Sequence, residues 1–184
     1  MTWTALGTLP VGLKAVLLEP NVDDRGSFTE IFRQEWENVN AKPVQWNVMR
    51  SRKGVLRGLH VHPHHKDYLV IMSGDLRVGL KDLRRDSATY SKAATIFLSP
   101  DKPVGLMIPN GVGHAFYSAS DTVLLYGVTE YYDPADELGC RWDDPGLEIP
   151  WKLESPILSQ RDTTAPTLAD LMLSLAEHHI DLSV

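Results

Sequence analysis

Short apolar or alternating runs recur along the chain and are separated by clusters of Gly, Pro, Asn and Asp. This spacing is typical of an antiparallel sandwich or barrel. The expected strands are Leu13–Leu18, Tyr68–Ser73, Thr95–Leu98, Gly105–Ile108, His114–Ser118 and Thr122–Thr129. The sequence therefore predicts an all-β fold.

Turn signals join several of these strands. Leu76–Lys81 alternates apolar with polar or small residues, which predicts a half-buried strand with one face in water. It follows Tyr68–Ser73 through Gly74-Asp75, which we interpret as a hairpin turn. Pro109-Asn110-Gly111 marks another turn, directly before His114.

Two helices are expected beside the strands. A short one is predicted around Arg33–Val39, and a C-terminal one at about 167–178. Thr167 is a candidate N-cap with Asp170 three residues later, a weak capping box. An apolar stripe then falls on one helix face: Leu168, Leu171, Met172 and Leu175.

The chain length bounds the domain organisation. A chain of 184 residues with 43% hydrophobic composition suits one domain, 1–184. Within it we expect a barrel core at about 45–132.

Charge and cysteine content narrow the function classes. A net charge of −6 argues against nonspecific nucleic-acid binding. The single cysteine, Cys140, cannot form an intramolecular disulfide and suits a reducing compartment. The N-terminal residues do not resemble a signal peptide, and no apolar run reaches the length of a membrane helix. We therefore expect a cytoplasmic protein without membrane contact.

Histidines gather in one segment. Four of the seven lie within GLHVHPHHKD, and His114 follows downstream in PNGVGHAF. One interpretation is a solvated loop plus a single core histidine. The other is a site at the mouth of a barrel, which Arg57 and His60 beside a Pro/His loop would suit.

Six segments carry a family resemblance, in order and with similar spacing: Asp23–Phe32, Gln45–Asn47, Arg50–His60, Ile108–Phe116, Leu124–Trp151 and Leu158–Asp162. Across about residues 13–166 the chain resembles the dTDP-4-dehydrorhamnose 3,5-epimerase family. The resemblance implies a cupin-type jelly roll that forms a homodimer and acts on a nucleotide-linked 4-keto-6-deoxyhexose. No cofactor is required under this interpretation.

The resemblance also implies roles for individual residues. The general base falls on His60, its aspartate partner on Asp162 and the general acid on Tyr126. A C–H bond beside a ketone is broken more easily because the carbanion delocalises as an enolate, and histidine suits such a base. Alternatively, Asp162 caps a turn and Tyr126 is a core aromatic.

Substrate contacts follow in the same way. Phosphate and sugar contacts fall on Gln45, Asn47, Arg57, His114, Glu137 and Arg161. Nucleobase contacts, some donated by a partner subunit from segment 13–32, fall on Arg25, Phe28, Glu30 and Tyr131. Arg25 and Glu30 could instead be an exposed strand pair.

Two positions depart from the family pattern. Asp67 stands where the family has a lysine, and neighbouring Lys66 could take that role only from a loop or a bulge. Val78 stands where the family has an aspartate behind the histidine at position 114. The base and the acid are retained, while the groups that would stabilise the enolate are changed.

The changed residues permit a metal alternative. The set His60, His62, Asp67 and His114 resembles a cupin metal site and would suit Fe, Mn, Ni, Zn or Cu. A divalent metal could replace the lysine as Lewis acid. Three hypotheses remain: an epimerase acting at C3, C5 or both, a metal-dependent cupin enzyme on another sugar or small acid, and a non-catalytic sugar-nucleotide binding protein.

Overall fold

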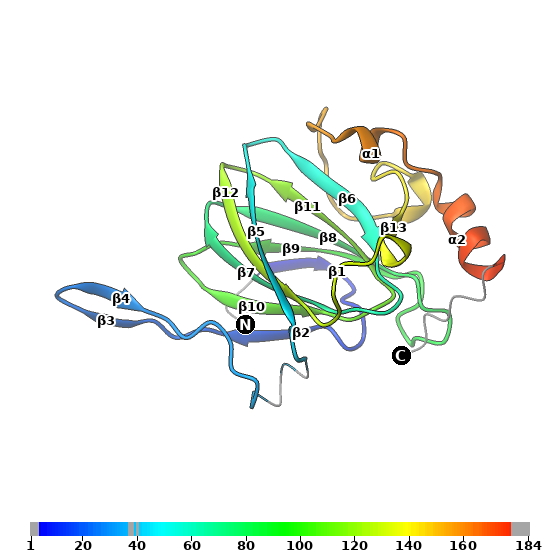
Figure 1. Cartoon of the computed structure of the whole chain (residues 1–184). Coiled ribbons are helices and arrows are strands. Elements are labelled where there is room, and N and C mark those ends of the chain that lie inside the picture. Colours follow the sequence, from blue (N-terminus) through cyan, green and yellow to red (C-terminus); the bar gives the residue numbers. More distant parts are fainter. Residues whose placement is uncertain (1–3, 37–38, 40, 178–184) are drawn as a thin grey trace.

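Two antiparallel sheets lie face to face and enclose the core (Figure 1). The computed structural model describes residues 4–36, 39 and 41–177. The six-stranded sheet has the order β1 (Thr4–Gly7), β9 (Ala93–Leu98), β8 (Leu76–Asp82), β11 (Val112–Ser118), β6 (Leu56–Val61), β13 (Leu138–Gly139). The five-stranded sheet has the order β2 (Lys14–Leu17), β10 (Val104–Ile108), β7 (Asp67–Ser73), β12 (Thr122–Val128), β5 (Gln45–Ser51). The expected all-β jelly roll is confirmed.

Strand alternation builds the core between the sheets. Leu76, Val78 and Leu80 of β8 are at most 1% exposed and pack against side chains of β10 and β7. Burying one such side chain contributes about 1.5–3 kcal/mol. Val78 therefore acts as a core residue, and no carboxylate stands at its position.

Most of the outer face of β8 is covered, contrary to the prediction for Leu76–Lys81, with Gly79 and Lys81 buried and Arg77 half-buried. Trp151 lies against Gly79 so closely that an added Cβ would meet its ring at 2.5 Å. Lys81 is 1% exposed, and its Nζ donates to the carbonyl of Ser91 at 2.8 Å. The C-terminal segment covers this face, because Trp151 and the helix that follows need an apolar surface to pack on.

The outer face of the five-stranded sheet is covered by the segment that follows β4. The Phe32 ring contacts that of Tyr68 edge-on at 5.3 Å, and the Tyr68 hydroxyl donates to the carbonyl of Ile31. The predicted helix around Arg33–Val39 is wrong for its described residues, which form successive turns, Trp36 to Arg33 and Val39 to Trp36. Packing of Phe32 and Trp36 on the sheet outweighs local helix propensity here.

The predicted hairpin at Gly74-Asp75 is also wrong. β7 and β8 belong to different sheets, so this turn carries the chain across the core instead of pairing its neighbours. Gly74 has φ +76°, and a Cβ there would meet the carbonyl oxygen of Asp121 at 2.0 Å. Glycine is needed at this crossing for both reasons.

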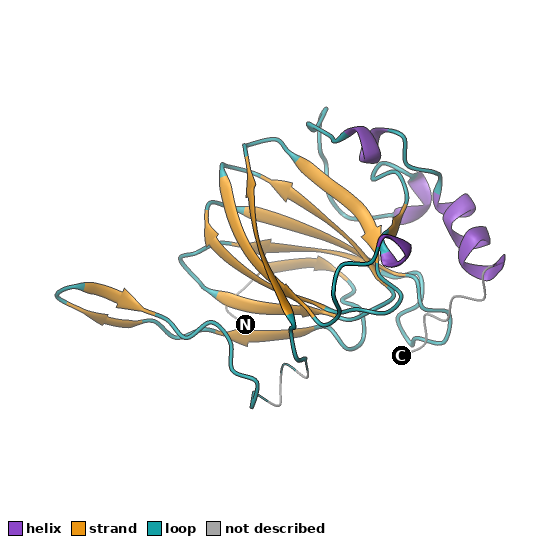
Figure 2. Cartoon of the chain, in the orientation of Figure 1, coloured by secondary structure: helices purple, strands orange, loops and turns teal. Residues whose placement is uncertain are grey.

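The helices gather at one side of the sheets, beside β6 and β13 (Figure 2). They are two 3₁₀ turns, Pro134–Asp136 and Pro145–Leu147, and the helices α1 (Gln160–Thr163) and α2 (Leu168–Glu177). The predicted capping box precedes α2, since Asp170 N donates to Thr167 Oγ1 at 3.1 Å. The expected end of this helix, at 178, lies outside the described residues. None of the helices in the described ranges is long and apolar enough to cross a membrane.

A separate two-stranded hairpin, β3 (Asn21–Asp23) and β4 (Gly26–Phe28), projects away from the sheets (Figure 1). Its apolar side chains are in solvent, with Val22 76% and Phe28 67% exposed. An isolated hairpin is at best marginally stable in water, and no further strand of the described residues pairs with this one.

Candidate active site

A pocket of about 380 Å³ opens between the two sheets. It gathers most of the residues that the sequence predicted for a site: His60, Asp162, Tyr126, Gln45, Asn47, Arg57, His114, Glu137 and Arg161. Five of the six segments that carry the family resemblance therefore contribute side chains to this cavity.

His60 and Asp162 form the central pair of this pocket. His60 lies on β6, and its Nε2 is 2.9 Å from Oδ1 of Asp162 on α1. A carboxylate accepts from the N–H of a neutral imidazole, so this contact places the proton on Nε2. The lone pair is then on Nδ1. Because the His60 ring lines the pocket, this nitrogen is available as a base.

The start of α1 holds the Asp162 carboxylate in place. Ser159 is the N-cap, and its hydroxyl donates to Oδ2 of Asp162 at 2.8 Å. Burial by itself raises the pKa of Asp162, but the hydrogen bonds from His60 and Ser159 outweigh it and keep this pKa below its usual value. Asp162 therefore stays ionised beside the imidazole.

Tyr126 lines the pocket from the opposite sheet. It lies on β12, with Asn47 of β5 and Leu69 of β7 as cross-strand neighbours. Burial raises the pKa of Tyr126, and the charges of Asp67 and Glu137 add to the effect. The phenol therefore keeps its proton. A molecule between the sheets would have His60 on one side and Tyr126 on the other.

Polar side chains line the rest of the pocket. Gln45 Nε2 donates to Oδ1 of Asn47 at 3.1 Å. Arg161 donates to the carboxylate of Glu137 at 3.2 Å and to its carbonyl at 2.8 Å. Arg57 donates from Nε to Ser51 Oγ at 3.0 Å and keeps an exposed side chain. Two guanidinium groups thus lie at the cavity, suited to an anionic ligand.

The four predicted nucleobase contacts lie outside this pocket. Arg25 and Phe28 are on the projecting β3–β4 hairpin, where Arg25 pairs with Asp23 at 2.5 Å. Glu30 pairs with Arg33, and Tyr131 is 73% exposed. A single chain does not bring these four side chains to the cavity.

The structure brings Asp67, and not Lys66, to the pocket. Asp67 begins β7 in register with Ile108 and Val128, and its side chain lines the cavity. Lys66 precedes the strand, its backbone N donates to Thr129 Oγ1, and its side chain does not line the pocket. Lys66 lies in the loop before the strand, and of this pair only Asp67 lines the cavity.

A buried histidine cluster surrounds Asp67. His62 Nε2 lies 3.9 Å and His114 Nε2 lies 3.6 Å from Oδ2 of Asp67. Burial raises the pKa of Asp67 to about 8 and lowers that of His62 to about 3. Burial also holds the pKa of His114 well below its usual value. Both imidazoles are therefore neutral.

The predicted four-residue metal set is only partly brought together. His62, Asp67 and His114 offer ligand atoms within 4.8 Å of one another, and His60 is not part of this group. The reason is that His60 turns its Nε2 to Asp162.

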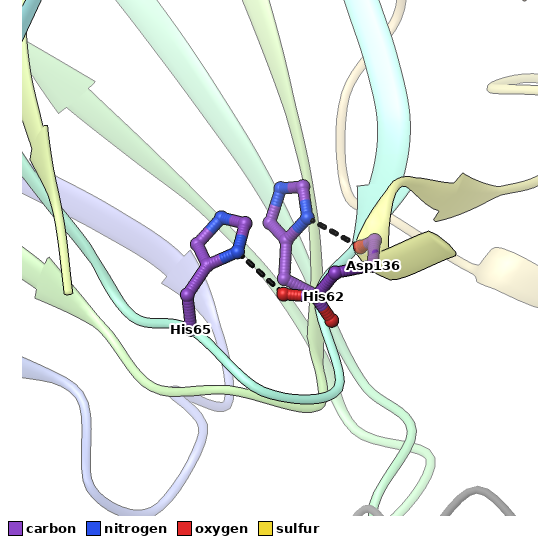
Figure 3. Close-up of side chains that lie close together, drawn as sticks. All are labelled: His62, His65 and Asp136. Atoms are coloured by element: carbon purple, nitrogen blue, oxygen red, sulfur yellow. Dashed lines mark hydrogen bonds and ion pairs between the residues drawn. The ribbon is translucent and has the colours of Figure 1, made fainter. Parts of the chain in front are cut away.

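Sequence reasoning missed three residues that hold the site's side chains in place: His65, Asp136 and Ser159. His65 Nδ1 lies 2.6 Å from Oδ2 of Asp136, and His62 Nδ1 lies 3.0 Å from the Asp136 carbonyl oxygen (Figure 3). The third is Ser159, which holds Asp162. An N-cap serine before an acidic first turn was a readable signal, whereas nothing near Asp136 indicated its contacts with residues about seventy positions earlier.

Fold and pocket together define a class: a jelly-roll protein with an Asp–His pair and a tyrosine on opposite walls of a polar cavity. The sequence profile of the dTDP-4-dehydrorhamnose 3,5-epimerase family matches residues 11–170. The chain belongs to this family. The family and the enzyme class expected from the sequence, an epimerase, are confirmed.

Individual relatives agree. The dTDP-4-dehydrorhamnose 3,5-epimerase of Escherichia coli K12 is 37% identical over 168 residues, covering 85% of this chain and 91% of the relative. That of Neisseria gonorrhoeae is 37% identical over 162 residues, covering 83% of this chain but 49% of the longer relative. A Legionella pneumophila epimerase, solved in complex with dTDP-4-keto-L-rhamnose, is 31% identical with a TM-score of 0.80, covering 92% of this chain and 96% of the relative.

Proposed function

We propose that this chain epimerises a dTDP-linked 4-keto-6-deoxyhexose at C3, C5 or both, in deoxysugar biosynthesis. Family membership supports the reaction class, and the ligand of the Legionella relative supports the substrate class. The observation that carries the proposal is the His60–Asp162 pair at 2.9 Å with Tyr126 on the opposite wall.

His60 acts as the base. Its Nδ1 takes the proton from the carbon beside the C4 ketone, and the electron pair of that C–H bond delocalises onto the ketone oxygen as an enolate. The Asp162 carboxylate, 2.9 Å from Nε2, stabilises the imidazolium that forms and fixes the ring orientation. This step needs no cofactor.

Tyr126 acts as the acid. Its phenol donates a proton to the same carbon from the other face, which collapses the enolate back to the ketone with inverted configuration. A phenol with a raised pKa is protonated at neutral pH, and Tyr126 is in that state through its burial. The β6 and β12 strands supply the opposite faces because they belong to different sheets.

Polar residues of the pocket hold the nucleotide diphosphate and the sugar. Arg57 and Arg161 offer planar cations for the phosphates, and Gln45 and Asn47 offer hydrogen bonds to the sugar. The Glu137 carboxylate orients Arg161 by accepting a hydrogen bond from its guanidinium group at 3.2 Å.

We also propose a homodimer in which each chain completes the other's site. Phe28, Arg25, Glu30 and Tyr131 would then contact the nucleobase across the interface. The projecting β3–β4 hairpin and the 67% exposure of Phe28 support this arrangement (Figure 1). The unpaired Cys140 and a nucleotide-sugar substrate support a cytoplasmic location.

Solvent deuterium exchange tests the proposal. In deuterated water, the wild-type chain should place deuterium at C3 or C5 of dTDP-4-keto-6-deoxyglucose, detected by NMR or mass spectrometry. His60→Ala should abolish exchange, whereas His64→Ala, in the same loop but exposed, should retain it. If saturating wild-type protein binds this sugar nucleotide without exchanging either position, the epimerase function fails for that substrate and a binding role replaces it.

A further inference from the structure

The imidazoles of His62, His65 and His114 form a cluster beside Asp67. This cluster takes no part in the proposed proton transfer that involves His60 and Tyr126. Each imidazole of the cluster places Nδ1 near an oxygen that can only accept. His62 lies 3.0 Å from the Asp136 carbonyl, His65 lies 2.6 Å from the Asp136 carboxylate, and His114 lies 3.2 Å from the Val112 carbonyl. Each Nδ1 therefore carries the hydrogen and donates it.

The opposite nitrogens then present lone pairs to one carboxylate. His62 Nε2 and His114 Nε2 lie 3.9 Å and 3.6 Å from Oδ2 of Asp67, and His65 Nε2 lies 3.9 Å from its Oδ1. Asp67 is 5% exposed, and no described residue donates a hydrogen bond to its carboxylate. When Asp67 is ionised, as a metal ligand must be, acceptor atoms face one another in a buried place, which is costly unless a cation lies between them.

We infer that His62, Asp67 and His114 bind a divalent transition-metal ion in the pocket wall. Two imidazoles and one carboxylate are a common ligand set for such ions. A tetrahedral ion with bonds of about 2.1 Å holds its ligand atoms roughly 3.4 Å apart. The separations of 3.6 Å and 3.9 Å are only slightly longer, so small side-chain rotations would close the site.

The surroundings of the three ligands match those of metal sites. Metal-bound histidines generally donate the other ring nitrogen to a carbonyl or carboxylate, which orients the ring. Asp136 provides this contact for His62 through its carbonyl and for its stacked neighbour His65 through its carboxylate (Figure 3). Three protein ligands leave a coordination position open, and all three line the cavity, so that position faces the substrate pocket.

Metal binding can be measured without substrate, which separates this inference from the proposed reaction. The full chain, purified without a metal-affinity step and stripped with a chelator, would be titrated with Zn²⁺ by calorimetry and with Co²⁺ by visible absorption. We expect a single equivalent with a Kd below about 1 μM. His62→Gln and Asp67→Asn should each weaken binding by at least about 100-fold.

His64→Gln is the matched control. His64 belongs to the same loop, but its side chain is exposed, so the variant should bind as the wild type does. Circular dichroism checks folding, and two ligand variants from different segments allow one to decide if the other is unfolded. Absence of saturable binding, retained affinity in a folded ligand variant, or equal loss in His64→Gln would overturn the site.

Discussion

Two buried aspartates of this chain have opposite surroundings. Asp82, at the end of β8 and 0% exposed, accepts hydrogen bonds from the backbone and guanidinium of Arg84 and from the hydroxyls of Ser87 and Thr89. Asp67, 5% exposed at the start of β7, receives none from any described residue. The donors around Asp82 outweigh its burial and lower its pKa, whereas burial raises the pKa of Asp67 to about 8.

The difference separates a carboxylate that stabilises the fold from one that we infer binds a metal ion. The Asp82 network fixes the β8–β9 connection and lies away from the pocket, so its donors serve stability. Asp67 lines the pocket and lacks donors, so burial disfavours its charged form until a cation binds. Such sites cost stability and are retained for function.

The largest expected effect is on activity and comes from the pocket. His60→Ala removes the base and should lower the deuterium exchange rate by about 10³-fold, equivalent to about 4 kcal/mol of barrier. The variant also removes a hydrogen bond from the buried Asp162 carboxylate, so the urea midpoint should fall, but by less than in Asp82→Ala because Ser159 still donates to Asp162. Exchange at the wild-type rate would show that another residue is the base.

The next effect belongs to the Asp82 network and should spare activity. Asp82→Ala leaves Arg84 buried at 1% exposure without its carboxylate, which should cost about 3 kcal/mol of unfolding free energy. Urea denaturation measures this loss, and exchange per folded chain should remain at the wild-type rate. A cost under about 1 kcal/mol would mean that the network contributes little.

Tyr126→Phe tests the opposite wall. The ring still packs in the core, but the proton donor is lost, so inversion should fall by about 10²-fold. Exchange at one carbon should persist, because His60 still removes that proton. NMR of the product distinguishes exchange from inversion. Unchanged inversion would assign the acid to another group.

Acid titration distinguishes Asp82 from an ordinary carboxylate. Its pKa is lowered in the folded protein, so its stabilisation is complete above about pH 4, the unfolded value, and is lost as pH falls through the folded pKa. Urea unfolding of the wild type should weaken by up to about 1.4 kcal/mol per pH unit in that window from this group. Asp82→Asn should flatten the slope, and parallel curves would exclude Asp82 as its source.

The smallest expected effect is an increase in the unfolding free energy, opposite in sign to the loss in Asp82→Ala. In metal-free protein, Asp67→Asn replaces a buried carboxylate among lone pairs by a neutral amide, and the unfolding free energy should rise by about 1 kcal/mol. Zn²⁺ should then stabilise the wild type and not the variant. A loss of stability on Asp67→Asn, like that on Asp82→Ala, would show that the two carboxylates are equivalent.

Local sequence patterns were enough to predict several strands, and family motifs were enough to predict part of the site. Thr95–Leu98 and Gly105–Ile108 each lie within an observed strand, because alternation is a property of neighbouring residues. Family motifs placed His60 and Asp162 in one site, and the structure brings them to 2.9 Å although 102 positions separate them. Their catalytic roles stay predictions.

The segments that cover the outer faces of the sheets could not be predicted from the sequence. Alternation in Leu76–Lys81 showed that the two faces of β8 differ, but not that Trp151 would cover the second one. Gly74-Asp75 has the residues of a hairpin turn, and the same glycine conformation serves equally to cross between sheets. Turn chemistry sets a local bend and does not choose the strand that pairs next.

Residue type and spacing were enough to predict most of the strands, the family and the set of residues available for chemistry. Tertiary structure alone decided which of two adjacent residues, Lys66 or Asp67, faces the cavity, and that His65 and Asp136 join the cluster around it. Side-chain direction and contacts between distant segments depend on how the sheets pack, and that packing is a property of the whole chain.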